Sequence, residues 1–551
     1  MRNFFTFNLS VLAALAASLS AAEPATVPPY SAQATPPNTT GTNKLTFIEQ
    51  TIAAQATTSD TPDSNRPKRF LTVLDCVQAA LQQNIDISIQ RLNPAIGAAQ
   101  VQTAEGIFDV NWVTGLKESE SQQPAGYFTS GGTVLTSPSA STRAYNYQNN
   151  LTGLTPLGTK YTVGFNGQRL QSSTFGTGLG PDWTMFMGAT VTQPLLKNFG
   201  WDVNTTQIRI AKKNQDISYQ QFVLFVMQTV ATVKQSYYNL VYDIDNVKVQ
   251  QESVDLARRF LDESRKRMEV GTMSRLDVVT AEAELSQNEG TLIDAQRQLE
   301  EDENTYKQLI SRDVLSIREV WLVPVDRPSI VAVPFDALDS IRQGLENRPE
   351  YLQNKLQLEI NHINLKYYQN QLLPQVDLAA SYGYNANNQG FNEDFSQLRN
   401  NFDSTGTGTF PTWSAGLTIT VPLGNNISRG NYRQWKLAVE QALLSLKKIE
   451  QTVIVGVEQA VIEARDKGKL IVSAQATTRL RLESYLAEVE KLKAGTSTTY
   501  TVLQMQRDLN TARVAELQAI NTYNQALVAL SLQEGTILKR NGVSVEPDAR
   551  K

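Results

Sequence analysis

Two long segments of the chain place hydrophobic residues at helical spacing. The first steps by three, four and seven residues through Phe222, Val226, Val230, Val233, Tyr237, Leu240, Ile244, Val247, Val254, Leu261 and Met268. The second steps by sevens through Val457, Ala464, Ile471, Thr478, Tyr485 and Leu492. A seam sustained over many turns is typical of helices packed along their length. It predicts a helix over residues 205–270, on the order of 100 Å long, and a similar helix in the second half of the chain.

Alternating apolar and polar residues precede the first long helical segment. The apolar positions are Tyr145, Tyr147 and Leu151, then Tyr161, Val163 and Phe165, and then Trp183, Met185, Met187, Ala189 and Val191. This period of two predicts strands that each have one apolar face. An ordinary antiparallel sheet explains the pattern, but aromatic residues near the strand ends favour strands of an outer-membrane barrel.

A proline ends the alternating run before each long helix. Pro194 stands in "TVTQPL" and Pro422 in "TITVPL". Because proline cannot donate a hydrogen bond to a strand ladder, we expect both residues to mark turns from strand to helix. The first half also has a hairpin-like segment at 156–158, which either adds two strands or forms a loop.

The sequence segments on either side of these prolines occur twice in the chain, in the same order. "LDCVQAALQQ" at Leu74 returns as "LDSIRQGLEN" at Leu338, and "RMEVGT" at Arg267 returns as "KLKAGT" at Lys491. Internal similarity of this kind indicates a duplicated unit, here helix, two strands, long helix and shorter helix. We therefore expect a first repeat at 68–315, a connection at 316–334, a second repeat at 335–538 and a C-terminal tail at 539–551.

Four further segments carry no sustained period. Residues 1–22 have the charged start and apolar stretch of a signal peptide, and residues 23–67 are rich in Pro and Thr, which predicts a disordered linker. Residues 119–144 and 385–410 combine Gly, Ser, Thr and Asn, which predicts surface loops outside the cell. No later run reaches the ~18 apolar residues of a membrane helix, so entry into a membrane would require a closed barrel.

The composition excludes several classes of protein. The 551 residues contain 50 Lys and Arg against 54 Asp and Glu, so we expect no nucleic-acid-binding surface. One cysteine, Cys76, and one histidine, His362, leave almost nothing for a disulfide, a metal site or a catalytic triad. Both residues stand in helical runs, where packing or solvation is their expected role. We therefore predict no enzyme, no metal and no cofactor.

The repeated order of elements, together with "QPLLKNFG", "RMEVGTMSRLDVV" and "KAGTSTTYTVLQMQRDL", resembles the TolC family of outer-membrane efflux proteins over residues 71–538. The resemblance implies a mainly α fold with a β-barrel part: a homotrimer with a short barrel in the outer-membrane lipid and an α-helical tunnel across the periplasm. It also implies export of small molecules or proteins. The implied partners are a periplasmic adaptor (membrane fusion) protein and an inner-membrane transporter.

The resemblance also assigns residues and a strand count. It implies four strands per chain, and it places adaptor-docking tips at Gly271, Thr272, Gly495 and Thr496. It places a periplasmic constriction at Asp277, Thr501 and Gln504, where the second and third positions are acidic in some members. For Asp277, the alternative is an ion pair with Arg275 or Arg507.

A soluble periplasmic coiled-coil protein, structural or adaptor, without a membrane barrel is the alternative interpretation of the whole chain. It explains the helices, but it does not explain duplicated strands with glycine-rich connections.

Overall fold

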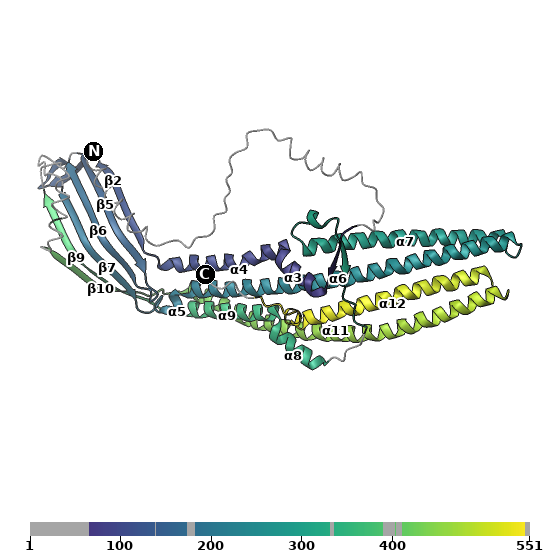
Figure 1. Cartoon of the computed structure of the whole chain (residues 1–551). Helices are drawn as coiled ribbons and strands as arrows, with labels where there is room; N and C mark the ends of the chain where they lie inside the picture. The colour runs from purple at the N-terminus through teal and green to yellow at the C-terminus, as the bar shows by residue number, and fades with distance from the viewer. Residues whose placement is uncertain are drawn as a thin grey trace, which may run out of the picture. The chain divides into compact units, whose positions relative to one another are not determined.

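The computed structural model describes residues 66–137, 139–173, 182–330, 336–389, 403 and 410–545. The predicted signal peptide and most of the predicted linker lie outside these residues. Helices and strands follow one another in two successive sets, as the duplication predicts (Figure 1).

The first set contains helices α3 to α7 and strands β1 to β7. Its elements are β1 (Lys68–Leu71), α3 (Val73–Gln83), α4 (Ile85–Glu105), the 3-10 turn η1 (Gly106–Phe108), β2 (Asn111–Gln123), β3 (Gly126–Ser130), β4 (Thr133–Ser137), β5 (Ala140–Leu154), β6 (Lys160–Ser173), β7 (Asp182–Pro194), α5 (Trp201–Asn204), α6 (Thr206–Glu269) and α7 (Arg275–Ile310). The long helix expected over 205–270 is α6.

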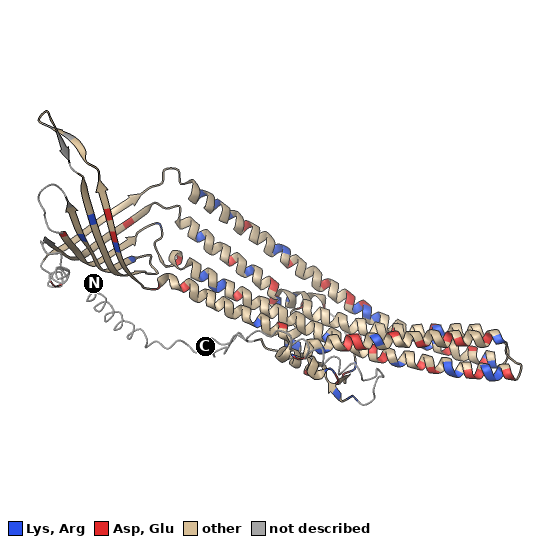
Figure 2. Ribbon diagram, turned by 90° about the horizontal axis from the view of Figure 1, so that it is seen from above, with Lys and Arg blue, Asp and Glu red and all other residues tan. Residues whose placement is uncertain are grey.

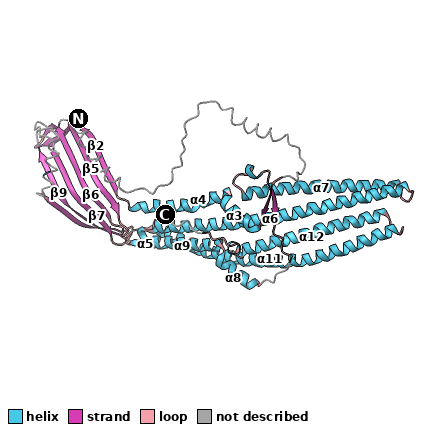
Figure 3. Ribbon diagram, viewed as in Figure 1, coloured by secondary structure: helices cyan, strands magenta, loops and turns pink. Residues whose placement is uncertain are grey.

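The second set follows a short connection and has fewer strands (Figure 3). The connection holds the 3-10 turn η2 (Leu315–Ile317) and β8 (Trp321–Pro324), and the second set consists of α8 (Ala337–Asn347), α9 (Pro349–Asn370), β9 (Gln375–Gln389), β10 (Pro411–Thr420), α11 (Asn426–Lys493), α12 (Thr499–Gln533) and α13 (Ile537–Arg540). No helix in the described part of the chain is both long and apolar enough to cross a membrane.

The heptad seam of α6 forms the largest hydrophobic core. Val230 and Val233 are fully buried. They belong to one cluster with Cys76 of α3, Ile87 of α4 and Tyr306 of α7. Fully burying an aliphatic side chain contributes about 1.5–3 kcal/mol. In the second copy, Val457 of α11 and Leu530 of α12 occupy the centre of a smaller cluster. Cys76 is therefore a packed core residue, and burial raises the pKa of its thiol to about 11.

A short parallel pair, β1 with β8, is bound to the middle of α6. The Tyr237 hydroxyl of α6 donates to the Leu71 carbonyl at 3.2 Å and accepts from the Asp326 amide at 2.9 Å. On α7, the buried pair Lys307–Glu303 (3.0 Å) holds the same connection, since the Leu322 amide donates to Glu303. Hydrogen bonds to both α6 and α7 thus hold the link between the two copies at Asp326 and Leu322.

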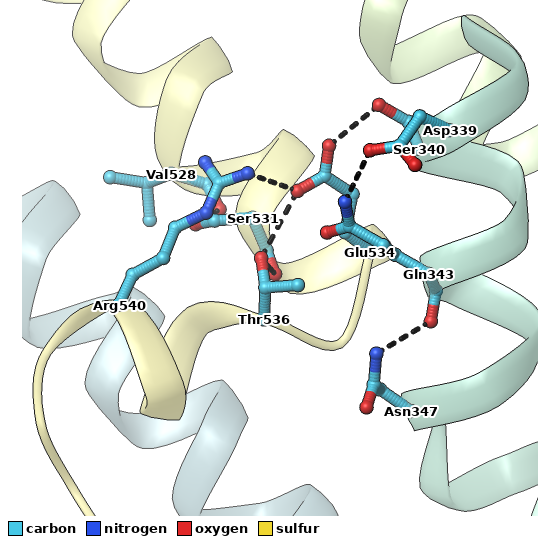
Figure 4. A network of polar contacts seen from close by, with 9 residues as sticks. All are labelled: Asp339, Ser340, Gln343, Asn347, Val528, Ser531, Glu534, Thr536 and Arg540. Atoms are coloured by element: carbon cyan, nitrogen blue, oxygen red, sulfur yellow. Dashed lines mark hydrogen bonds and ion pairs between the residues drawn. The ribbon is translucent and has the colours of Figure 1, made fainter. Parts of the chain in front are cut away.

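A buried carboxylate joins the end of the second copy to its first helix (Figure 4). Glu534, only 2% exposed, follows α12 directly. It accepts from the Ser340 hydroxyl of α8 at 2.7 Å, the Thr536 hydroxyl at 3.0 Å and the Arg540 guanidinium at 2.5 Å. Three donors satisfy a charge that would otherwise be costly to bury.

The main sheet has six strands in the order β10-β9-β7-β6-β5-β2, and every neighbouring pair is antiparallel. The open question at 156–158 is therefore answered, because this segment is the turn between β5 and β6. The four strands per chain implied by the resemblance are too few for this chain.

The predicted loop at 119–144 is wrong in its local structure. Residues 119–123 continue β2, residues 140–144 begin β5, and the two segments pair with each other. Between them, β3 and β4 form a separate hairpin that turns at Gly131 and Gly132, both with positive φ. In the second predicted loop, residues 385–389 continue β9, and residues 390–402 and 404–409 lie outside the described part. The composition hid the end of β2 because residues 119–123 are polar on both faces of the strand.

The two faces of the sheet differ sharply in chemistry. One cross-strand row runs over all six strands through apolar residues: Trp112, Leu151, Val163, Ala189, Tyr382 and Trp413. The opposite face carries mostly polar or small residues, for example Asn150, Gly164, Gly188, Gly383 and Thr412 in one row, which ends at Val113 of β2. The apolar row stays open to the surroundings, with Trp413 75% exposed. The alternation read from the sequence is therefore the alternation of two sheet faces.

Two carboxylates meet between α6 and α7. Asp243 is 4% exposed, and its Oδ2 atom has no hydrogen-bond partner among the described residues. Burial, followed by a hydrogen bond and charge repulsion from Asp302, raises the pKa of Asp243 to about 8. The folded protein therefore holds a proton here at neutral pH that the unfolded chain releases.

We expect Glu534→Ala to lower the free energy of unfolding by about 2–4 kcal/mol, because two buried hydroxyls and a guanidinium lose their acceptor. Glu534→Gln keeps the shape and should cost less, about 1–2 kcal/mol. Denaturant unfolding followed by circular dichroism measures both. The matched control is Glu346→Ala, at an exposed carboxylate of α8. Equal, small effects at both positions would contradict the assigned role.

We expect Asp243→Asn to stabilise the protein at pH 8 by on the order of 5 kcal/mol, because about four pKa units at about 1.4 kcal/mol each separate the folded from the unfolded carboxyl group. Since the folded pKa is raised above the unfolded value near 3.8, the favourable contribution of this group is present below pH 4 and is lost as pH rises towards 8. The difference in melting temperature between variant and wild type should grow over that window. Asp262→Asn, at an exposed position of the same helix, should show no such growth.

Candidate functional site

Each long helix ends in the same turn. α6 ends before Gly271 and α11 before Gly495, and both glycines have positive φ, +77° and +76°. In the first turn the Gly271 amide donates to Met268 at 3.0 Å and the Thr272 amide to Arg267 at 2.9 Å. Gly495 and Thr496 donate to Leu492 and Lys491 in the same way. This pair of bonds satisfies the last helical carbonyls, and its left-handed residue favours glycine.

The helix that follows each turn is capped by a hydroxyl. The Ser274 side chain accepts from the Asp277 amide, and the Asp277 carboxylate accepts from the Ser274 hydroxyl at 2.6 Å and its amide at 3.3 Å. In the second hairpin, Thr498 accepts from the Thr501 amide at 3.3 Å, and the two hydroxyls lie 2.8 Å apart. Asp277 and Thr501 therefore occupy equivalent capping positions in the two copies.

Gln504 lies one turn beyond Thr501. Its amide nitrogen donates to Asp508 at 3.0 Å, and Asp508 also pairs with Arg481 of α11 at 3.0 Å. Among the described residues, no hydrogen bond joins Asp277 to Thr501 or Gln504. The three residues predicted at the constriction thus lie near the two tips, and each bonds within its own hairpin.

The two hairpins contact each other through polar side chains slightly farther from the tips. Arg507 of α12 pairs with Glu284 of α7 at 3.1 Å. Asn510 donates to Gln250 of α6 at 3.1 Å, and Arg513 pairs with Glu252 at 3.2 Å. Three successive turns of α12 are therefore bound to the first hairpin.

The Arg507–Glu284 pair joins a buried carboxylate to an exposed guanidinium. The Glu284 side chain is only 8% exposed, whereas that of Arg507 is 45% exposed. Burial raises the pKa of Glu284 above its usual range, and the Arg507 guanidinium acts in the opposite direction. Gln506, 4% exposed, has no partner among the described residues for either side-chain polar atom. The contact between hairpins is consequently polar where it is most buried.

Sequence reasoning missed these residues. Arg507 was considered only as a partner of Asp277, whose carboxylate instead bonds to Ser274, and Arg507 bonds to Glu284. A signal was present, because Glu284 falls on the same stripe as the buried residues Val278 and Ala281. A carboxylate on a buried helical stripe needs a partner from another helix.

The tips differ from the remainder of the helices in their surface. Val270, Leu276 and Tyr500 are 74%, 74% and 64% exposed around the two turns. Charged residues are frequent along both hairpins and sparse on the strands (Figure 2).

Between the hairpins near the tips lies a small cavity lined by residues such as Phe260, Met273, Tyr485 and Leu492. No group of three or more His, Cys, Asp or Glu side chains in the described ranges could hold a metal ion.

The two prolines lie where strands give way to helices. Pro194 is the last residue of β7, and the Leu195 amide beyond it still donates to Val376 at 2.7 Å. Pro422 stands between β10 and α11 and is exposed. The turn at 194–200 therefore stays attached to the sheet, whereas residues 421–424 around Pro422 are exposed.

Comparison with known proteins identifies relatives of one kind. The family model described as outer membrane efflux protein matches residues 159–312 and 340–536. Outer membrane protein TolC of Escherichia coli (strain K12) is 22% identical over 367 residues, which cover 65% of this chain and 71% of that protein. A membrane protein from Pseudomonas aeruginosa has a similar structure (TM-score 0.62, 14% identity, 87% of this chain and 92% of that chain). The Campylobacter jejuni CmeC outer membrane channel is also similar (TM-score 0.58, 16% identity, 86% and 87%).

The family match covers more than half of the chain and takes in the later part of the first copy and most of the second. It agrees with the two-faced sheet and the paired helical hairpins. The chain therefore belongs to the outer membrane efflux protein family, and it is an outer-membrane efflux channel of the TolC type that extends into the periplasm.

Proposed function

We propose that three copies of this chain form one continuous export duct, with a β-barrel in the outer membrane and a helical tunnel in the periplasm. The observation that carries the proposal is the two-faced sheet with open edges. Its apolar face suits lipid and its polar face suits a water-filled lumen. Within the described residues, β2 and β10 each pair on one side only.

Open edges make assembly necessary. Unsatisfied backbone groups in a bilayer cost several kcal/mol each, so a spanning sheet must close on itself. Six strands from one chain are fewer than the eight of the smallest outer-membrane barrels. Closure with neighbouring copies removes both edges, and the three-copy arrangement comes from the resemblance to the family.

The hairpin tips at Gly271, Thr272, Gly495 and Thr496 are the proposed docking points for a periplasmic adaptor protein. Their support is the matched geometry of the two turns and the exposed apolar side chains beside them. An adaptor bound there would connect the duct to an inner-membrane transporter that supplies the energy. The chain itself then conducts solutes and performs no chemistry.

Asp277, Thr501 and Gln504 are the proposed constriction. In a trimer, the first turns of α7 and α12 would surround a common axis, with Asp277 contributing the only charge of the three. We propose that the resting state is held closed mainly by polar contacts between the hairpins, among them the pair of Arg507 with the buried Glu284.

A soluble periplasmic coiled-coil protein without a membrane part is not supported. That interpretation requires helices without membrane strands, whereas the family match reaches into β6 and β7 and covers β9 and β10.

We expect the purified full-length protein to have the mass of three chains in mild detergent, measured by light scattering. Cysteines placed at Thr272 and Thr496 should crosslink to an adaptor in intact cells, and a control cysteine at the exposed Asp262 of α6 should not. A stable monomer would overturn the assembly, whereas a trimer without tip-specific crosslinks would overturn only the docking assignment.

We expect Arg507→Ala to loosen the closed state, because Glu284 is left as a buried carboxylate without its partner. The cost is about 1–2 kcal/mol, below that of a fully buried pair, since the guanidinium is half exposed. Single-channel recording should show at least a several-fold higher open probability, which Arg507→Ala with Glu284→Gln should partly reverse. Arg481→Ala breaks the pair with Asp508, which lies within one hairpin, and is the control. Identical behaviour of the two single variants would contradict the assignment.

A further inference from the structure

The sheet is unequally shared between the two copies of the repeat. Among the described residues, the second copy contributes β9 and β10 to the sheet, whereas the first contributes β2, β5, β6 and β7. β5 and β6 form the extra hairpin, which lies between β2 and β7. The duplication therefore accounts for four strands and leaves one inserted pair.

The inserted hairpin is paired along its whole length. β5 and β6 pair from Leu154 opposite Lys160 to Ser141 opposite Ser173. Its outer sides pair continuously as well, β5 with β2 and β6 with β7. No described strand is skipped, so the hairpin is a full part of the sheet and is not an appendage on its surface.

The chemistry of the hairpin matches that of its neighbours. Leu151 and Val163 supply the middle of the apolar row that runs from Trp112 to Trp413. On the polar face, the Asn150 amide donates to Asn166 at 2.8 Å, and the Gln168 amide donates to Asn146 at 3.1 Å. Both faces therefore continue across the inserted strands without a change of character.

The turn of the hairpin is built into the junction between sheet and helices. Gly158 has φ +91°, and a Cβ there would lie 2.5 Å from the Asn198 carbonyl oxygen. The Gly200 amide donates to the Leu157 carbonyl at 3.3 Å, and the Thr159 hydroxyl donates to Gln193 at 2.5 Å. The close approach requires glycine at position 158. The turn and the segment at 194–200 thus support each other.

We infer that the barrel of this channel is closed by six strands from each chain, so that three chains make eighteen strands, where the family resemblance implies twelve. The inference rests on the proposed trimer. β2 and β10 run in opposite directions, because five antiparallel pairings separate them in the sheet. The free edge of β2 can therefore pair with β10 of the next copy as an antiparallel neighbour, and the ring closes without a parallel pair.

Added strands widen the barrel. Barrel diameter grows roughly linearly with strand number, so eighteen strands give a diameter about 1.5 times that of twelve and a cross-section about twofold larger. The lumen side carries Asn, Gln, Thr, Ser and Gly at most positions, among them Gln148, Asn166, Thr190, Asn385 and Ser414. Such an exit suits bulky hydrophilic solutes and imposes little charge selection.

The decisive measurement is the number of strands in the ring of the full-length trimer, counted by electron cryo-microscopy in detergent or nanodiscs. We expect eighteen. A trimeric ring of twelve strands, with β5 and β6 outside the wall, would overturn the inference and leave the proposed function intact. A monomer would instead overturn the proposed trimer, so the two failures can be told apart.

A deletion tests the width. Replacing residues 124–181 by a short Gly-Ser turn removes β3 to β6 and joins β2 directly to β7. The main sheet loses two strands, β5 and β6, and β2 and β7 remain antiparallel. The variant should form a trimer with twelve strands and a barrel about 1.5 times narrower. The control deletion replaces residues 124–139, which removes only β3 and β4, and should keep the full width. A variant trimer of unchanged diameter would overturn the inference, and if the variant does not fold, the strand count of the wild type decides.

Discussion

Backbone hydrogen bonding in a medium without water is the constraint on which this structure depends. A sheet with one apolar face can lie against lipid only if no edge is left open. Among the described residues, this chain forms a sheet with a mainly apolar and a mainly polar face, but its outer strands, β2 and β10, are each paired on one side. The same residues that make the sheet suitable for a membrane thus make the single chain incomplete. Assembly is a consequence of strand chemistry before any contact between helices is considered.

The helices solve a different problem. α6 and α11 are too long to be buried by one domain, so each folds back through a glycine turn and packs against a shorter partner, α7 or α12. Within each hairpin the contact is hydrophobic, as at Val457 and Leu530. Between the hairpins, the contacts at Arg507 and Glu284 and at Asn510 and Gln250 are polar. A hydrophobic seam fixes a structure, whereas a polar contact costs less to break, because water can replace its hydrogen bonds. Hydrophobic contacts within each hairpin and polar contacts between the hairpins would let the two hairpins separate while each keeps its own structure.

The duplication explains the order of elements, and the departures from it are where this chain is specific. Both copies keep the same glycine turn and a capping hydroxyl after it, at Ser274 and Thr498. They differ at the third residue of the following helix, where Asp277 completes a reciprocal cap and Thr501 supplies only a hydroxyl. They differ most in the sheet, where the first copy carries the added hairpin. Its turn is bound to the strand-to-helix junction at 194–200, so the extra strands depend on a local contact that the second copy lacks.

The sequence by itself determined the helices and strands whose pattern of apolar residues is set by positions close together in the chain. Heptad spacing predicted α6 almost to the residue, and alternation at Tyr161, Val163 and Phe165 predicted a strand with the correct apolar face. Tertiary structure alone decided which segments come together. Residues 119–123 look like a loop because their composition is polar, and they are a strand only because β5 pairs beside them. Glu284 looks like a solvated charge until α12 brings Arg507 to it. Periodicity is a property of adjacent residues, whereas pairing between distant segments depends on packing that no short stretch of the chain encodes.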